Sequence, residues 1–316
     1  MTVFAWGHQR RFNDFPSHFR RLFNKRVQKV SLDTGFTCPN RDGKRGWGGC
    51  TYCNNKSFNP LYCNLGISIP DQVNRGIEFF AEKYPDMLYL AYFQAYTNTY
   101  APLENLKVLY NEALRHPKVK GLVVATRPDC VNDEILDFLQ QLSEQVYVMV
   151  EYGVESHLNR TLQLINRGHT FEESIKALEA TASRNIRTCA HLILGLPGET
   201  YEDFMEQAQI ISQLPVENLK LHQLQIHKGT VMVGQYEQNP EAFHLFSVGE
   251  YADLVVDYLE WLNPRIVVER FISQSPPDFL IAPRWGLKNF EFVAKVESRL
   301  KERDTWQGRK YEAAVL

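Results

Sequence analysis

From residue 27 onward the sequence alternates between segments typical of β-strands and segments typical of α-helices. Strands that alternate with helices in this way pair in parallel and are joined by right-handed crossovers. The expected strands span 27–32, 87–93, 121–126, 146–152, 187–194 and 218–226, and the expected helices span 71–84, 103–115, 132–142, 156–165, 171–184, 201–213 and 248–262. The sequence therefore predicts an α/β fold of six β–α units, wound either as an open sheet or as a barrel.

Both arrangements place functional groups at the carboxyl ends of the strands. Polar and turn-forming residues follow five of the expected strands, in the segments 94–99, 126–129, 151–156, 195–200 and 227–230. Each segment alone is explained by turn chemistry, because Gly, Pro, Asn and Thr close such loops in many proteins. Five of them in one sheet favour a single pocket, and we expect the active site there.

The pattern divides the chain into three parts. We expect a basic and aromatic N-terminal segment over 1–26, a core barrel over 27–262 and a C-terminal extension over 263–316. Within the extension, residues 266–272 are typical of a further strand and residues 287–303 of a helix.

Charge is unevenly distributed along the chain. Residues 1–50 hold ten Lys and Arg against three acidic residues, although the whole chain has 35 against 37. Phe12, Phe15, Phe19 and Phe23 lie among these cations near helical spacing. We favour an amphipathic segment that packs its Phe side chains on the core, and RNA contact by the arginines is the alternative.

The expected cellular compartment follows from two features that the sequence lacks. No apolar run approaches the ~18 residues of a membrane span, and the first residues lack the layout of a secretory signal. We therefore expect a cytoplasmic protein with no membrane partner, in which thiols serve metals or chemistry rather than disulfides.

Four of the six cysteines fall between residues 38 and 63, in the pattern Cys38-x11-Cys50-x2-Cys53-x9-Cys63. Thiolates suit zinc and iron–sulfur clusters. A closed zinc site needs four ligands, with Cys63 as the fourth, whereas a [4Fe–4S] cluster on three cysteines keeps one iron open. The spacing alone leaves both sites open. Cys130 and Cys189 are interpreted as small buried apolar residues.

Several segments resemble one family. Residues 38–53, with Tyr52 just before the last cysteine, are similar to the cluster loop of radical S-adenosylmethionine (SAM) enzymes, which fold as a partial (β/α)6 TIM-like barrel. Segments 152–156, 167–169 and 192–200 resemble the branch of oxygen-independent coproporphyrinogen dehydrogenase and the elongator-type catalytic subunit. Segments 31–40, 126–130 and 282–285 resemble most the YhcC-like family of bacterial radical SAM proteins.

The resemblance implies a role for particular residues. Cys38, Cys50 and Cys53 match the ligands of a [4Fe–4S] cluster whose fourth iron binds SAM. The residues that match SAM-contacting positions are Tyr52 at the adenine, Gln94 at the methionine amino group, Glu155 and Arg167 at the ribose and carboxylate, His191 where a relative has an acid, and Leu194 and Gly195 beside the adenine. Glu155 departs from the Gln usual at its position.

The implied activity is reductive cleavage of SAM to a 5′-deoxyadenosyl radical that takes hydrogen from a substrate. The resemblance leaves the substrate unidentified, with RNA among the candidates, and implies a low-potential electron donor of the flavodoxin or ferredoxin type. The alternative is a zinc-stabilised RNA-binding protein without radical chemistry.

Overall fold

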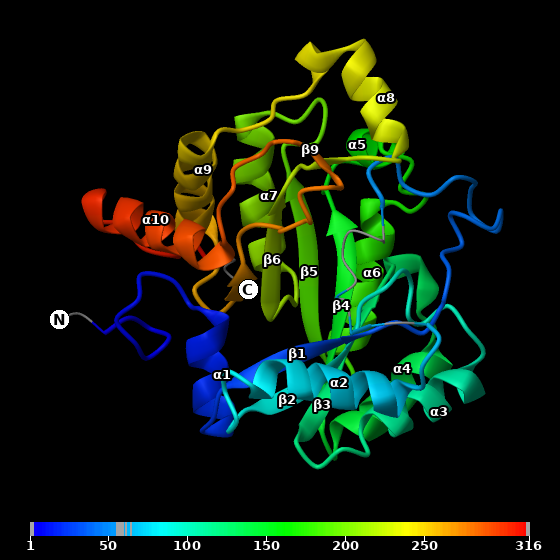
Figure 1. The fold of residues 1–316 in the computed structure, drawn as a ribbon. Coiled ribbons are helices and arrows are strands. Elements are labelled where there is room, and N and C mark those ends of the chain that lie inside the picture. Colours follow the sequence, from blue (N-terminus) through cyan, green and yellow to red (C-terminus); the bar gives the residue numbers. More distant parts are fainter. Residues whose placement is uncertain (1–2, 55–59, 61, 64, 314–316) are drawn as a thin grey trace.

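A seven-stranded parallel sheet forms the centre of the computed structural model, which describes residues 3–54, 60, 62–63 and 65–313 (Figure 1). The strands are β1 (Val27–Leu32), β2 (Leu88–Phe93), β3 (Val119–Thr126), β4 (Tyr147–Glu155), β5 (Arg187–Leu194), β6 (Asn218–Gln223) and β8 (Val267–Arg270). They pair in the order β1-β2-β3-β4-β5-β6-β8 and curl into a half-barrel. The predicted α/β partial barrel is confirmed, and the segment after residue 263 supplies its seventh strand.

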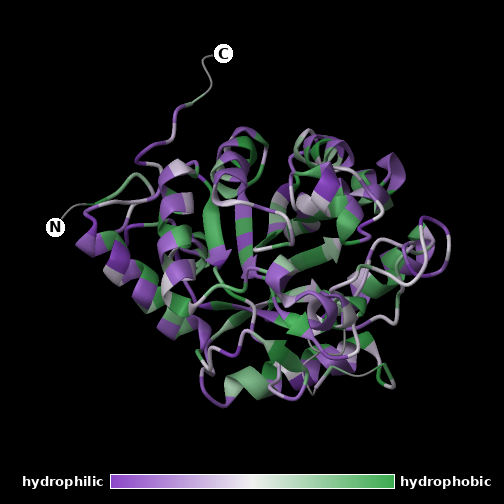
Figure 2. Ribbon diagram, turned by 90° about the horizontal axis from the view of Figure 1, so that it is seen from above, coloured by the Kyte–Doolittle hydropathy of each residue, from purple (hydrophilic) through white to green (hydrophobic). Residues whose placement is uncertain are grey.

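Helices cover the outer face of the half-barrel. They are α2 (Ile69–Ala81), α3 (Leu103–Ala113), α4 (Asp133–Ser143), α5 (Asn159–Leu164), α6 (Phe171–Ala182), α7 (Tyr201–Gln213) and α9 (Val248–Trp261), with short 3₁₀ turns at Pro128–Cys130 and Pro240–Ala242. Most begin at a Ser, Thr or Asn whose side chain accepts a hydrogen bond from the first turn,. The main apolar core lies between these helices and the sheet, and Figure 2 shows helices banded in apolar and polar residues,.

A short pair of strands and one helix were not expected from the sequence. The predicted strand 218–226 ends at Gln223, and after a short break β7 (Ile226–His227) pairs antiparallel with β9 (Leu280–Ala282). Helix α8 (Val231–Gln238) follows β7. Its eight residues include Gly234 and it has no side-chain cap, so the local sequence gives little helical signal,. No helix in the described part of the chain is both long and apolar enough to cross a membrane.

The N-terminal segment forms α1 (Phe15–Phe23), which closes the lower end of the half-barrel. Phe19 is buried against an apolar cluster on the inner face of the sheet, and its ring meets the edge of Tyr147 at a centroid distance of 5.2 Å. Phe12 is also buried, while Phe15 and Phe23 are half-buried. The interpretation that these rings pack on the core is confirmed.

The two ends of the chain pack together. The backbone N–H of Asn13 donates to Gln307 Oε1 at 2.9 Å, and Asp14 forms a parallel bridge with Val268 of β8. Helix α10 (Asn289–Glu302) packs on α9. The N-terminal segment and the C-terminal extension thus meet along the outer edge of β8.

Above the apolar floor, four charged side chains form a buried cluster that we call the ion quartet: Lys29 of β1, Glu151 of β4, Lys220 of β6 and Glu269 of β8. Lys29 contacts both carboxylates, Glu269 at 2.6 Å, and Lys220 also contacts both, Glu151 at 2.7 Å and Glu269 at 3.0 Å. Because β1 and β8 are the two edges of the sheet, the Lys29–Glu269 pair joins edges that share no backbone pairing. The quartet therefore holds the sheet in its curled form.

We expect Phe19→Ala to lower the free energy of unfolding by about 3–5 kcal/mol, because it empties the buried site between α1 and the sheet. Leu22→Ala on the same helix is the control, since Leu22 is 47% exposed and should change stability by less than about 0.5 kcal/mol. Urea denaturation followed by circular dichroism measures both. Equal effects of the two substitutions would contradict the role assigned to α1.

Candidate functional site

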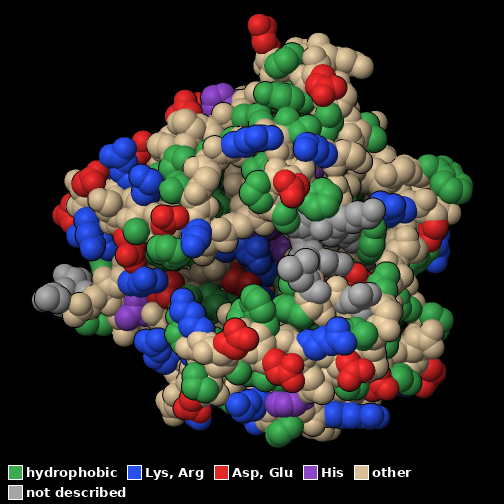
Figure 3. All heavy atoms as spheres, in the orientation of Figure 1, with side chains coloured by type: hydrophobic (Ala, Val, Ile, Leu, Met, Phe, Trp, Pro, Cys, Tyr) green, Lys and Arg blue, Asp and Glu red, His purple; other side chains and the backbone are tan. Residues whose placement is uncertain are grey.

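A cavity opens at the carboxyl ends of the strands, and Figure 3 shows charged and His side chains inside a hollow on this face. Residues from four of the five predicted segments line it: 94–99, 126–129, 151–156 and 227–230. The segment 195–200 does not line the cavity. Gly195 turns the chain away with φ +95°, and a Cβ there would come within 2.9 Å of the Phe246 ring. From β5 the cavity receives His191 and Ile193 instead.

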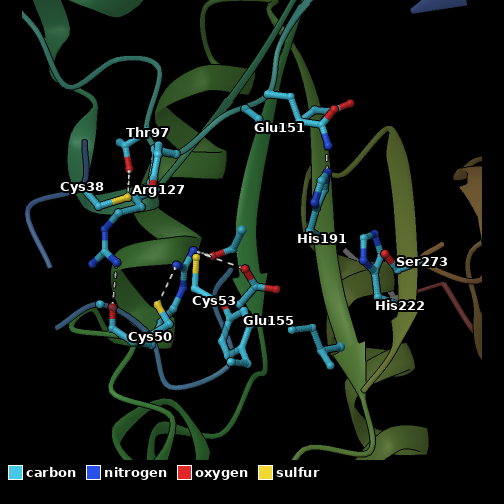
Figure 4. A pocket seen from close by; sticks show the side chains of 18 of the residues that line it. Cys38, Cys50, Cys53, Thr97, Arg127, Glu151, Glu155, His191, His222 and Ser273 are labelled. Carbon is cyan, nitrogen blue, oxygen red and sulfur yellow. Dashed lines mark hydrogen bonds and ion pairs between the residues drawn. The ribbon is translucent and has the colours of Figure 1, made fainter. Parts of the chain in front are cut away.

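Cys38, Cys50 and Cys53 all line this cavity, and we call them the thiol group (Figure 4). They come from the loop after β1, where the first strand ends. The Cys38 Sγ lies 2.8 Å from Thr97 Oγ1, a hydrogen bond to the loop after β2. Burial, together with the neighbouring Cys50 and Cys38, raises the pKa of Cys53 to about 12. The three half-buried cysteines therefore lie close enough to influence one another.

Two side chains approach the sulfur of Cys50, one from the same loop and one from the turn between α5 and α6. Arg167 Nη1 donates to Cys50 Sγ at 3.4 Å and Asn40 Nδ2 lies 3.8 Å from the same sulfur. Arg167 Nε and Asn40 Oδ1 are buried without a hydrogen-bond partner among the described residues. A guanidinium and an amide beside these sulfurs suit a group of net negative charge, and the two unpartnered polar atoms leave hydrogen-bonding capacity for it.

The geometry of the thiol group fits a cluster better than a single zinc ion. Three sulfurs on one zinc at ~2.3 Å lie only ~3.8 Å from one another. In the described part of the chain, the sulfur atoms of Cys38, Cys50 and Cys53 do not all lie within 4.8 Å of one another. A cluster spreads its ligands over separate irons and accepts the wider spacing.

Cys63 lies apart from the thiol group. It is buried, its thiol donates to Gln72 Oε1 of α2 at 3.2 Å, and it does not line the cavity. The four-cysteine zinc site of the alternative hypothesis is therefore not favoured.

The two remaining cysteines lie at different depths. Cys130 is half-buried beside Asp129, whereas the sequence analysis expected a buried apolar residue. Cys189 is fully buried, as expected. Its sulfur lies within 4.8 Å of ligand atoms of Glu151 and His191, the one such set in the described residues. Two lysines already contact Glu151, so a metal cation there would meet positive charge.

The structure brings five of the seven predicted SAM-contacting residues to the cavity: Tyr52, Gln94, Glu155, Arg167 and His191. Gln94 accepts a hydrogen bond from Ser31 Oγ at 3.0 Å, and Arg167 Nη2 lies 3.4 Å from Glu155. Leu194 is buried and, like Gly195, is not among the lining residues. The roles of all seven stay predictions.

Backbone strain gathers at this site. Glu155 has φ +68°, and the β4–β5 register shifts between Gly153 and Glu155. Tyr96 and Asn166, in neighbouring loops, also have positive φ. A left-handed conformation is costly for residues with a Cβ and persists where surrounding structure imposes it, often at functional sites.

Glu151 of the ion quartet lines the cavity beside His191. Burial alone would raise the pKa of Glu151, but Lys220 and Lys29 outweigh it and hold this pKa well below its usual range. His191 Nε2 lies 3.1 Å from Glu151 Oε2. Burial and the charge of Lys220 lower the pKa of His191, so its imidazole is held in place in the neutral form.

Sequence reasoning missed several residues of the cavity. Asn40, His222 and Arg270 line it, as do Arg127 and Thr97, which lay inside predicted segments without an assigned role. The sequence does contain one sign of the ion quartet, at Lys29 and Lys220. Each is a lysine inside a strand of the parallel sheet, where a charged side chain is uncommon because such sheets are covered on both faces.

Comparison with protein families identifies two regions. The family model of the radical SAM superfamily matches residues 38–210. A second model, the Radical_SAM C-terminal domain, matches residues 216–302. The first match begins at the first cysteine of the thiol group and covers more than half of the chain.

Relatives span nearly the whole chain. The uncharacterized protein YtqA of Bacillus subtilis is 36% identical over 96% of this chain and 94% of its own length. Protein YhcC of Escherichia coli is 32% identical over 93% of this chain and 94% of its own length. The solved structure of archaeal Methanocaldococcus infernus Elp3 superposes with a TM-score of 0.67 and 16% identity, over 89% of this chain and 64% of that one. The last likeness supports the fold alone.

We expect Glu151→Gln to lower the free energy of unfolding at pH 7 by about 3–5 kcal/mol, because it leaves two buried lysines short of a carboxylate. The folded-state pKa of Glu151 lies below its unfolded value. Its stabilising contribution is therefore complete above about pH 4.5 and is lost as the pH falls toward the folded-state value. Urea denaturation between pH 3.5 and 7 should show a steeper loss of stability in the wild type than in the variant. Glu134→Gln, on the exposed surface of α4, is the control, and a parallel pH profile for Glu151→Gln and wild type would contradict the prediction.

Proposed function

This chain belongs to the radical SAM superfamily, and we propose that Cys38, Cys50 and Cys53 hold its [4Fe–4S] cluster and that SAM binds at the cluster's open iron. The cofactors of this enzyme class are that cluster and SAM. The observation that carries the assignment to this chain is the single cavity shared by three cysteines, with Cys63 turned away to Gln72. A cluster held by three thiols keeps the fourth corner that SAM requires.

When bound, the cluster and SAM supply a one-electron cleavage of the sulfonium, and the resulting 5′-deoxyadenosyl radical takes a hydrogen atom from substrate. The chain's own residues hold the cofactors and shape the cavity. Arg167 and Asn40 donate toward the sulfur of Cys50, and hydrogen bonds to cluster sulfurs tune the reduction potential,.

The SAM-contacting roles follow from the same proposal. Tyr52 would supply stacking area beside the thiol group, Gln94 would bind the methionine amino group, and Glu155 and Arg167 would bind the ribose and the carboxylate. His191 stands on the cavity floor, fixed by Glu151. Leu194 and Gly195 do not line the cavity, so their predicted place beside the adenine is not part of this proposal.

Water exclusion is the second requirement of radical chemistry, because a reactive intermediate must meet only its substrate. The closed lower end supplies it. Phe19 of α1 closes the lower end of the half-barrel. In the ion quartet above it, each charge is paired with an opposite charge, so the quartet does not attract water. We infer that the hydrogen-abstraction step takes place in this inner part of the half-barrel.

The electron reaches the cluster from a low-potential donor of the flavodoxin or ferredoxin type. We place its approach at the loop between Cys38 and Cys50, where Trp47 is 75% exposed and Arg41 and Lys44 are also exposed. A cationic surface with an aromatic side chain suits an acidic partner. All six cysteines are free thiols, which suits the cytoplasm as the compartment.

RNA remains a candidate substrate, but only two cations of the basic N-terminal segment support it. Several cations of the basic segment pair with acids of the fold: Arg10 with Asp14 and Glu297, Arg11 with Asp304, and Lys25 with Asp86. Arg20 and Arg21 of α1 are exposed and have no carboxylate partner among the described residues. They are the pair through which an RNA phosphate would bind.

Each of Cys38→Ala, Cys50→Ala and Cys53→Ala should lower 5′-deoxyadenosine formation by more than about 100-fold, since even loss of a supporting partner of a metal site costs 10–100-fold. The assay is anaerobic reconstitution with iron and sulfide, reduction by dithionite, and chromatography of the SAM products. Iron content should fall in parallel.

Cys63→Ala is the matched control, because Cys63 is the fourth ligand only in the zinc alternative. We expect it to keep the iron content and SAM cleavage of the wild type. A colourless wild-type protein that binds one zinc, and loses it on Cys63→Ala, would overturn the proposed function.

If RNA is the substrate, Arg20→Ala with Arg21→Ala should weaken binding of a tRNA pool and reduce the slope of log affinity against log salt by about 2, one per lost phosphate contact. Filter binding between 50 and 200 mM salt measures the slope. Arg115→Ala with Lys120→Ala removes the same charge from another exposed surface and is the control. Absence of tRNA binding by the wild type at low salt would remove RNA from the candidates.

A further inference from the structure

Strand β8 carries a local irregularity at the edge of the cavity. Its parallel register with β6 passes from Leu219 opposite Val268 to Lys220 opposite Arg270, so Glu269 is an extra residue in the ladder. In a regular strand, successive side chains point to opposite faces. Here Glu269 and Arg270 both face inward, because Glu269 contacts Lys29 and Lys220 while Arg270 lines the cavity. A bulge of this kind redirects a side chain, and here it brings Arg270 into the cavity.

Arg270 adds a positive charge that the protein does not balance. The ion quartet is neutral, with two lysines and two glutamates in mutual contact. Arg270 is half-buried and makes no ion pair or hydrogen bond with the residues that the structure describes. Partly buried charges are normally paired, because leaving water is costly for them. An unpaired guanidinium at a cavity wall therefore points to an anion that arrives from outside.

His222 lies beside Arg270 on the neighbouring strand. It is two residues beyond Lys220, the residue opposite Arg270, and lines the same cavity. Its Nε2 is buried without a hydrogen-bond partner among the described residues. Burial and then the charge of Arg270 lower its pKa well below the usual value, so the ring is neutral and able to donate one hydrogen bond,.

We propose that Arg270 and His222 form a subsite that binds an anionic group, a carboxylate or a phosphate, of the substrate. The inference rests on the proposed function, in which substrate enters this cavity, and it names the chemical class that the cavity accepts. Arg270 supplies a planar fork of donors that suits either anion, and His222 supplies one further donor.

The subsite is separate from the thiol group. Figure 4 shows His222 and Ser273 on one side of the cavity and Cys38, Cys50 and Cys53 on the other, with Glu155 between them. In the proposed function, Arg167 beside the thiol group would bind the carboxylate of SAM. The anion at Arg270 is therefore assigned to the substrate and not to the cofactor.

The test uses the full chain, reconstituted anaerobically, with two probes: inorganic phosphate and acetate, each at constant ionic strength. Isothermal titration calorimetry measures the affinity of wild type and of Arg270→Gln. Arg265→Gln is the matched control, because Arg265 precedes the same strand and is exposed. We expect at least one probe to bind the wild type, Arg270→Gln to lose about 10–100-fold in affinity, the range for hydrogen bonds to charged groups, and Arg265→Gln to change it less than threefold.

A second measurement keeps the test independent of how Arg270→Gln folds. In wild-type protein labelled with ¹⁵N-histidine, the ring signals of His222, assigned with His222→Gln, should shift during titration with the probe that binds. Phosphate binding with no acetate binding assigns a phosphorylated substrate, and the reverse assigns a carboxylate.

Three results would overturn the proposal: neither probe binds the wild type, Arg270→Gln binds as the wild type does, or saturating SAM displaces the probe. The last would show that Arg270 serves the cofactor. The proposed function is judged separately, by iron content and SAM cleavage of the wild type. Anion binding without SAM cleavage would refute that function, and SAM cleavage without anion binding would refute only the subsite.

Discussion

The ion quartet is the interaction on which the rest of this structure depends. A sheet of seven parallel strands has two free edges, and backbone pairing alone does not determine whether it stays open or curls. Lys29 on one edge contacts Glu269 on the other and Glu151 in the middle. Buried ion pairs add little net stability, yet breaking one leaves a charge without a partner. The quartet therefore makes the curled form specific, and the cavity exists only in that form.

The inner face of the half-barrel is ordered in layers. Phe19 and its apolar neighbours form the floor, the quartet lies above them, and the neutral imidazoles of His191 and His222 come next. The cysteines occupy the top, at the loop after β1. Because the buried charges cancel within their own layer, Arg270 at the wall and the arginines near Cys50 are what an incoming molecule meets. The proposed cofactor site and the proposed anion subsite thus lie on different sides of the cavity.

Much of the fold and of the candidate site can be predicted from the sequence. Whether a feature can be predicted depends on how far apart in the chain its residues lie. Strands and helices follow from local periodicity, and Cys38, Cys50 and Cys53 follow from spacing within one loop. The Lys29–Glu269 contact joins residues 240 positions apart, and no local pattern reveals it. The bulge that turns Arg270 inward depends on how β8 pairs with β6. Leu194 and Gly195 show the same limit, since motif position did not predict that the chain turns from the cavity there.

The long sequence separation between Lys29 and Glu269 also affects folding during synthesis. Lys29 leaves the ribosome early, whereas the strand that carries Glu269 is among the last parts to be synthesised. Until then β1 lacks the partner on the far edge, and Asn13 and Asp14 lack the strand beside which they lie. Contacts of such high sequence separation form late and slow folding. The nascent polypeptide must therefore hold a partly assembled sheet, in which Lys29 can pair with Glu151 but not yet with Glu269, until the end of translation.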